Sequence, residues 1–284
     1  NRVGNRAKTN MGNLFSSLQK VLPQHGLSRL VGTLAKSENP FISKTFIEQF
    51  AKAYDISLTE AQRKSLSEYV SFNDFFTRAL EPGVRPMPSQ ANVLASPVDG
   101  AVSQIGKIDG NQLMQAKGHR YTVGSLAGEA AMGFDNGDFC TIYLAPNDYH
   151  RIHLPFAGQL EKTYAVPGAL FSVNGATEEG VEGLFCRNER LVCRFNTEFG
   201  PMLVVLVGAL IVASIETVWP GPRSPYKVEQ YNDHSIGLNR GDEIGRFLLG
   251  STVICCFPKG AVELNPELKV GSKIRLGENL GKVL

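Results

Sequence analysis

The sequence predicts an α+β fold, with N-terminal amphipathic helices followed by a β-rich domain. Over residues 14–34 the apolar positions recur at spacings of three, four and seven, which is typical of helices. From about residue 90, glycines and prolines separate short apolar runs, which is typical of strands joined by turns. The 284 residues are 43% hydrophobic, so the chain can bury a core and is not expected to be disordered.

The helical part is predicted to contain four stretches. Pro23 and Gly26 interrupt the first apolar pattern and divide it into two short helices, at about 14–22 and 27–34. Two further helices are expected at about 43–54 and 59–69. Residues 1–10, ahead of Met11, are interpreted as an extension or tag remnant.

The first two helices carry basic residues on their polar sides, namely Lys20, Arg29 and Lys36, with no acidic residue before Glu38. A helix pair of this kind either packs on the domain core or lies in a membrane interface. The basic face and the N-terminal position slightly favour the membrane. Residues 11–80 are therefore predicted to be a helical, membrane-associating segment, and residues 81–284 the β-rich catalytic domain.

Composition excludes several classes of protein. The net charge of +2 provides no basic surface of the kind that binds nucleic acid. The five cysteines are odd in number and lack zinc-site spacing, so neither a disulfide framework nor a metal site is expected. The longest apolar run, 202–215, is shorter than the roughly 18 residues of a spanning helix and is predicted to be a buried strand with a turn or bulge at Gly208. No secretory signal is expected.

The usual nucleotide-binding loops and the Gly-x-Ser-x-Gly nucleophile elbow are absent from the sequence. His150 and His153 lie three residues apart, beside Asp148 and Tyr149. They would face together on a helix or tight turn and oppositely on a strand, and the sequence leaves both geometries open. A histidine pair with an adjacent acid is either structural or suited to acid–base work. No third metal ligand is evident nearby.

Two further residues matter because of their flanks. Asp99 precedes Gly100, and an Asp-Gly pair by itself usually marks only a turn. Ser251 follows Gly250 within an apolar run that is otherwise typical of a buried strand. Glycine permits an unusual backbone conformation there, so the Ser251 hydroxyl could attack the carbonyl group of Gly250.

Together with these residues, seven separated motifs resemble the bacterial, proenzyme-type phosphatidylserine decarboxylases, in order over nearly all of residues 11–284. The stretch 220–233 departs from the family by being shorter than expected. The motifs are PVDG (97–100), QAKGH (115–119), DYHRIH (148–153), PGALFSVN (167–174), RNER (187–190), TEFGP (197–201) and LGST (249–252).

The resemblance implies a zymogen that cuts itself between Gly250 and Ser251 into a β chain, 1–250, and an α chain, 251–284. Ser251 would become a covalent pyruvoyl group, the electron sink for decarboxylation, so neither pyridoxal phosphate nor a metal is expected. The resemblance implies a cleavage triad of Asp99, His153 and Ser251. It also suggests His150 as the group that protonates the product and holds the substrate carboxylate.

The resemblance further implies that phosphatidylserine is converted to phosphatidylethanolamine and CO2. The enzyme would bind an anionic membrane surface peripherally, on the cytoplasmic face of a bacterial inner membrane, with a homodimer possible. Two alternatives remain open at this point. One is a serine hydrolase of lipid esters that uses Ser251, His153 and Asp99 without self-cleavage, and the other is a non-catalytic lipid-binding module.

Overall fold

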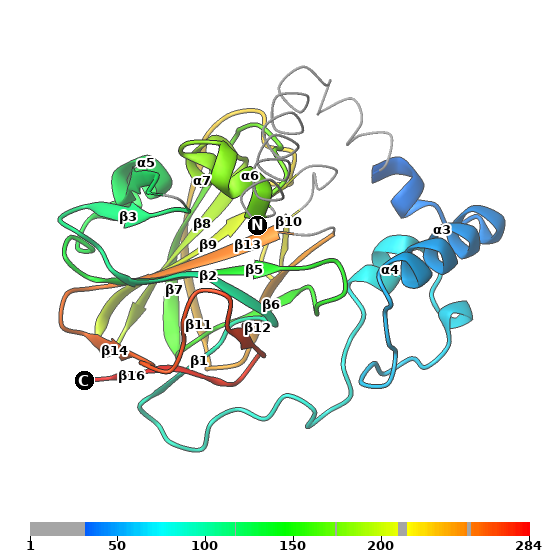
Figure 1. Cartoon of the computed structure of the whole chain (residues 1–284), viewed down its shortest axis with the longest axis horizontal. Helices are drawn as coiled ribbons and strands as arrows, with labels where there is room; N and C mark the ends of the chain where they lie inside the picture. Colours follow the sequence, from blue (N-terminus) through cyan, green and yellow to red (C-terminus); the bar gives the residue numbers. More distant parts are fainter. Residues whose placement is uncertain (1–31, 117, 174, 210–214, 249–250) are drawn as a thin grey trace, which may run out of the picture.

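The computed structural model describes residues 32–116, 118–173, 175–209, 215–248 and 251–284. Figure 1 shows a β-rich body and, to one side of it, a helical part that contains α3 (Pro40–Ala53), η1 (Leu66–Glu68) and α4 (Phe72–Phe76). A long connection without helix or strand leads from the helical part into the body, where β1 (Val93–Ala95) begins. The predicted α+β class is confirmed.

The body is built on an eight-stranded sheet whose neighbouring strands all pair antiparallel, in the order β11-β7-β8-β9-β13-β5-β2-β15. Its central strand, β13, lies between β9 and β5. The strands are β2 (Gly100–Lys107), β5 (Asp138–Leu144), β7 (Gly158–Val166), β8 (Arg190–Thr197), β9 (Gly200–Val207), β11 (Gln230–Leu238), β13 (Ser251–Phe257) and β15 (Lys273–Ile274).

Short helices and a hairpin cover one face of this sheet, and two small sheets, β1-β16-β14 and β10-β12-β6, cover the other. The first layer comprises β3 (Gln112–Met114), β4 (Arg120–Thr122), α5 (Val123–Ala127), η2 (Gly128–Ala131), α6 (Gly175–Gly180) and α7 (Leu184–Arg187). The second comprises, besides β1, β6 (Arg151–His153), β10 (Ile215–Thr217), β12 (Glu243–Phe247), β14 (Val262–Leu264) and β16 (Asn279–Val283).

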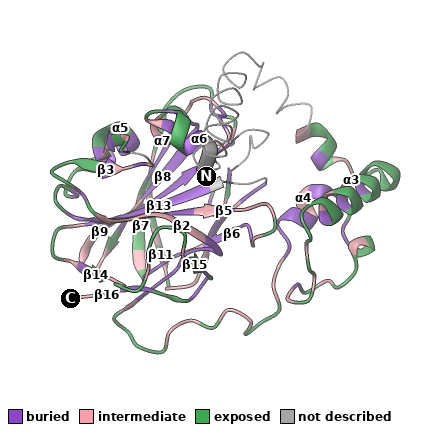
Figure 2. Cartoon of the chain, viewed as in Figure 1, coloured by how far each residue is buried: buried purple, intermediate pink, exposed green. Residues whose placement is uncertain are grey.

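The covering of both faces explains why β9 and β13 are apolar at nearly every position. Val205 and Ile254 belong to the core beneath the helices, whereas Val204 and Val253 belong to the core beneath the small sheets. The middle of the sheet is buried throughout (Figure 2). The predicted buried strand is confirmed up to Val207, just before Gly208, and Ile215 then begins β10 in another sheet.

Of the helices predicted in the helical part, one is confirmed and one is not. α3 matches the helix predicted at 43–54, with the Asn39 side chain capping the N–H of Phe41 at 3.0 Å and a proline in its first turn. Its apolar face packs on α4, where the Phe46 and Phe72 rings stack with centroids 4.3 Å apart. Part of the segment predicted to bind membrane is therefore occupied by internal packing.

The prediction of a helix at 59–69 is wrong: within this segment only Leu66–Glu68 is helical, as a 3-10 turn. Ala61 forms an isolated bridge with Leu80, and the capping box of Ser65 and Glu68 starts a new, short 3-10 helix. These contacts use backbone groups that a continuous helix would need. Residues 32–36 are helical, but the rest of the predicted helices at 14–22 and 27–34, and the 1–10 extension, lie outside the described residues. Within the part of the chain that is described, no helix is long and apolar enough to cross a membrane.

Close packing at the start of β2 predicts that Gly100 tolerates no larger residue. A Cβ atom there would lie 2.4 Å from the carbonyl oxygen of Tyr143, whereas one at Gly237 in β11 would meet nothing within 4 Å. We expect Gly100→Ala to lower the free energy of unfolding by about 1–3 kcal/mol, and the control Gly237→Ala to change it little. Urea unfolding of both variants checks this, and equal effects would contradict it.

Candidate active site

The register of the central sheet brings Asp99 and Ser251 to the same end of the body. Ser251 pairs with Leu144 on β5, and Thr252 pairs with Tyr143, which in turn pairs with Ala101 on β2. The starts of β13 and β2 are therefore level and two strands apart, roughly 10 Å at the usual strand spacing. Asp99 immediately precedes β2. Gly250 and the side chain of Ser251 lie outside the described residues.

The DYHRIH motif runs past the same end of the sheet. His150 directly precedes β6, and its carbonyl oxygen accepts a hydrogen bond from the Phe247 N–H at 3.0 Å. Phe247 ends β12, three residues before Gly250. The backbone of His150 therefore lies beside the chain that leads into the Gly250–Ser251 link.

The His150 ring is completely buried and neutral at physiological pH. Burial lowers the pKa of His150 to about 3 from its ordinary 6.5. Nδ1 lies 2.8 Å from the carbonyl oxygen of Asp148, which can only accept, so Nδ1 carries the proton. Nε2 then presents a lone pair, and this buried atom has no hydrogen-bond partner among the described residues. The Phe76 ring packs against the His150 ring, with the two ring centroids 4.0 Å apart.

His153 has a similar arrangement with different partners. Its Nδ1 lies 2.7 Å from the carbonyl oxygen of Gly241, which fixes the proton on Nδ1. Its Nε2 lies 3.1 Å from the Tyr149 hydroxyl, which is then the donor. Burial lowers the pKa of His153, so this ring is also a neutral proton acceptor. The two histidines thus use separate carbonyl groups and share no hydrogen bond.

Asp99 does not contact His153 in the way the resemblance implies. The Asp99 carboxylate instead accepts from Arg85, with Nη2–Oδ2 at 2.6 Å and Nε–Oδ1 at 3.0 Å. It also accepts from the backbone N–H of Leu276 at 2.8 Å. Both ring nitrogens of His153 have other partners, so Asp99 and His153 share no hydrogen bond, although they lie at one end of the sheet.

Two residues of this site went unnoticed in the sequence, Arg85 and Arg78. Both line a cavity of about 580 Å³ that also contacts Asp99, Asp148 and Tyr149. Arg78 is 5% exposed and donates from Nη2 to the Asn147 carbonyl oxygen at 3.0 Å, and its Nη1 has no partner in the described part of the chain. Neither arginine stands in a local motif with the residues it contacts, because those residues are distant in sequence.

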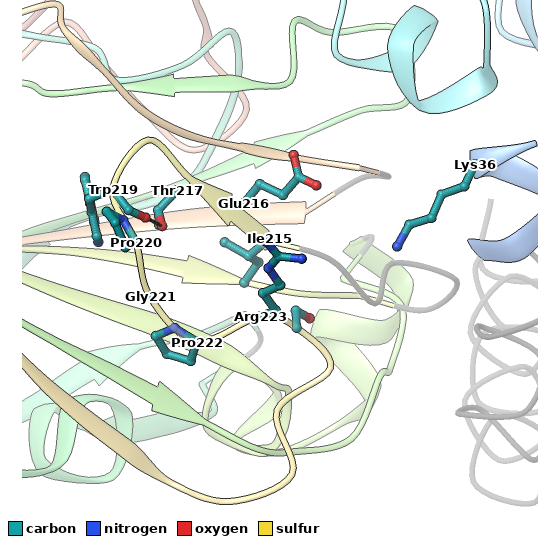
Figure 3. Close-up of a pocket in the computed structure, with 10 residues that line it drawn as sticks. Lys36, Ile215, Glu216, Thr217, Trp219, Pro220, Gly221, Pro222 and Arg223 are labelled. Carbon is teal, nitrogen blue, oxygen red and sulfur yellow. Dashed lines mark hydrogen bonds between the residues drawn. The ribbon is translucent and has the colours of Figure 1, made fainter. Parts of the chain in front are cut away.

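A second cavity, of about 520 Å³, lies beside β10 (Figure 3). Ile215 and Glu216 of β10 line it, together with Trp219, Arg223 and, from the N-terminal part, Lys36. Because Ile215 pairs with Phe247, this cavity flanks β12 just ahead of the Gly250–Ser251 link. Among the described residues, no group of three or more His, Cys, Asp or Glu side chains could hold a metal ion.

Comparisons with known proteins agree with the seven motifs. The sequence model of one family, described as phosphatidylserine decarboxylase, matches residues 72–282, and a second, described as PSD, matches residues 14–55. The chain is 53% identical over 277 residues to the phosphatidylserine decarboxylase proenzyme of Alcanivorax borkumensis, covering 94% of this chain and 95% of that protein. With the protein of the same name from Hahella chejuensis it shares 50% identity over 278 residues, covering 95% and 94%.

A third relative, the phosphatidylserine decarboxylase proenzyme of Saccharophagus degradans, is 48% identical over 278 residues, covering 95% of this chain and 97% of that protein. The resemblance inferred from the motifs is confirmed, as is the expectation that the chain is a decarboxylase. The chain belongs to the phosphatidylserine decarboxylase family.

Proposed function

We propose that this chain is a zymogen that cuts itself between Gly250 and Ser251 and then converts phosphatidylserine to phosphatidylethanolamine and CO2. Family membership supports the decarboxylation. The observation that supports the finer proposal is the placement of Ser251 at the start of the buried central strand, level with the start of β2 just after Asp99. The products of the cut are a β chain, 1–250, and an α chain, 251–284.

Self-cleavage begins when the Ser251 hydroxyl attacks the Gly250 carbonyl and forms an ester in place of the peptide bond. Elimination then releases the β chain with a free carboxylate, and hydrolysis releases ammonia and leaves a pyruvoyl group at residue 251. His153 is the proposed base, because burial keeps it neutral with the lone pair on Nε2. The Tyr149 hydroxyl must release that nitrogen first. Asp99 supports the base electrostatically from the same end of the sheet.

The surroundings of Ser251 fit a pyruvoyl group, which supplies a ketone that withdraws electrons from the substrate α-carbon. His150 offers a buried Nε2 that has no partner within the residues the structure describes, which is costly unless the atom has a function. We assign this Nε2 the proton of the substrate ammonium group: its lone pair is free before substrate binds, and the substrate carboxylate beside the ring would offset the burial that otherwise disfavours the protonated imidazole. The same atom returns the proton to the α-carbon after CO2 leaves. The apolar surroundings exclude water and favour loss of the charged carboxylate.

The helical part is proposed to bring the enzyme to its lipid. Leu34, in the helical residues 32–36, and Phe41 and Ile42, at the start of α3, are exposed, with Phe41 84% exposed. With Lys20, Arg29 and Lys36 they provide apolar and basic groups for peripheral binding to an anionic membrane. We propose that the enzyme binds peripherally at the cytoplasmic face of a bacterial inner membrane. A homodimer is compatible with the proposal but is not required by it.

Chain cleavage is the first test. We expect intact-mass measurement of the purified protein to give two fragments that meet at 250/251, with the smaller fragment gaining mass on borohydride reduction of its ketone. Ser251→Ala should remain one chain and release no CO2 from phosphatidylserine. A single uncut wild-type chain that an organophosphonate labels at Ser251 would instead indicate the lipid-ester hydrolase.

The two histidines should separate the two reactions. We expect His153→Gln to slow chain cleavage and His150→Gln to leave cleavage largely intact while lowering decarboxylation by about 10²- to 10⁴-fold. His234→Gln is the matched control. His234 lies on β11, away from Asp99 and Ser251, and its Nε2 is hydrogen-bonded to the Thr163 hydroxyl at 2.9 Å. Time courses of cleavage and of CO2 release in the three variants check the assignment. Loss of cleavage in His150→Gln would contradict it.

The buried His150 also predicts a pH dependence of stability. Its pKa is about 3 when folded and 6.5 as the ordinary value, so below pH 6.5 the unfolded chain binds the extra proton. The free energy of unfolding should therefore fall by about 1.4 kcal/mol per pH unit from this residue as pH drops from about 6.5 towards 3. His153, whose pKa is also lowered, contributes in the same direction.

Urea unfolding of Ser251→Ala, with and without His150→Gln, isolates the His150 contribution, because all other titrating groups are shared. Both proteins carry the same substitution at the cleavage site, so chain continuity is not a variable. Identical slopes of stability against pH in the two proteins would show that His150 is not held neutral by burial.

A further inference from the structure

An ion network with a buried Arg85–Asp99 pair joins the helical part to the start of β2. Arg85, in the long connection before β1, is 8% exposed in its side chain, and Asp99 is 10% exposed. The guanidinium group binds both carboxylate oxygens, in the planar two-point geometry that arginine forms with carboxylates. The Leu276 N–H completes the set of donors to Asp99.

Arg85 is itself fixed by a second acid. Glu60, from the segment between α3 and η1, accepts from Arg85 Nη2 at 2.7 Å, and Arg275 donates to the other oxygen of Glu60 at 3.2 Å. Arg85 Nη1 donates to the carbonyl oxygen of Val84 at 3.0 Å. The hydrogen bond with Asp99 raises the pKa of Arg85, so the guanidinium keeps its charge. The orientation of Asp99 is therefore set by the Glu60–Arg85 pair and not by His153.

We propose that Arg85 is the positioning residue of Asp99 in self-cleavage, and that Glu60 holds Arg85 in place for this purpose. The inference rests on the proposed function, in which Asp99 supports the base. Without Arg85 the carboxylate would be a buried charge with one backbone donor, free to turn or to move toward solvent. Its field at the end of the sheet where Ser251 begins β13 would then no longer be fixed.

Lysine cannot reproduce this role fully. An ammonium group is a point charge on a flexible chain, and it lacks the planar fork that binds Asp99 and Glu60 together. Arg85→Lys should therefore retain the charge and the fold but orient Asp99 less well. This makes the conservative variant informative even if Arg85→Met folds poorly.

The experiment follows chain cleavage over time during cell-free synthesis of the full chain. The variants are Arg85→Met, Arg85→Lys, Asp99→Asn and the double variant Arg85→Met with Asp99→Asn. Arg63→Met is the matched control, because Arg63 forms an equivalent two-point pair with Asp74, at 2.7 and 2.5 Å, within the helical part. Thermal unfolding of each variant combined with Ser251→Ala reports folding separately from cleavage.

We expect Arg85→Met to slow cleavage by about tenfold to a hundredfold, Arg85→Lys to be intermediate, and Arg63→Met to cleave as the wild type does. Since Arg85 acts through Asp99, the double variant should cleave no more slowly than Asp99→Asn alone. That absence of a further effect is a result that a general loss of stability would not produce.

Three outcomes would overturn the inference: wild-type cleavage in Arg85→Met, equal slowing in Arg63→Met, or multiplied effects in the double variant. If any of these occurs while the wild type cleaves and Asp99→Asn cleaves measurably more slowly, the inference fails and the proposed function stands. A wild-type chain that never cleaves overturns both.

Discussion

The position of β13 in the middle of the sheet is the constraint on which the rest of the structure depends. Strands on both sides pair with it, and both of its faces are covered, so its backbone has no freedom of placement. The chain leaves β12 at Phe247 and enters β13 at Ser251, with only three residues between. The strands on either side of this link are fixed by their own pairing, so the two ends of the link have set positions without a binding step.

Burial controls the chemistry at this end of the body in two opposite ways. It keeps His150 and His153 neutral, with the proton fixed on Nδ1 by a backbone carbonyl group in each ring. Asp99 is buried as well, but a guanidinium group compensates its charge. Neutral imidazoles and a compensated carboxylate thus lie at one end of the sheet with most of their surface buried, which suits the proton transfers proposed for them.

Local patterns in the sequence predict the elements well where burial is simple. The continuous apolar runs of β9 and β13 indicate strands covered on both faces, and the apolar spacing of α3 indicates a helix. The helix expected at 59–69 is wrong because the apolar pattern does not reveal that Ser65 starts a new cap or that Ala61 bridges to Leu80. Caps and bridges of this kind depend on the tertiary fold.

The candidate site likewise has residues that the sequence predicts and contacts that only the structure shows. Asp99, His150, His153 and Ser251 were identified by motif, but only the strand register shows that Asp99 and Ser251 share one end of the sheet. The Arg85–Asp99 and Phe76–His150 contacts join segments with no common pattern, so the sequence gives no signal for them. The resemblance implies a triad of Asp99, His153 and Ser251, whereas the contact that Asp99 forms is with Arg85, whose positive charge complements the carboxylate.

The pairing of the C-terminal segment has a consequence for the timing of maturation. Residues 251–284 supply β13 to the centre of the large sheet, β15 to its edge, and β14 and β16 to a sheet with β1. After a break before Ser251, the strands of residues 251–284 would remain paired with strands of residues 1–250. Separating the two fragments would require unfolding the body. Under the proposed self-cleavage, pairing of these strands would have to precede the cut, so cleavage would follow assembly and incompletely folded chains would remain uncut.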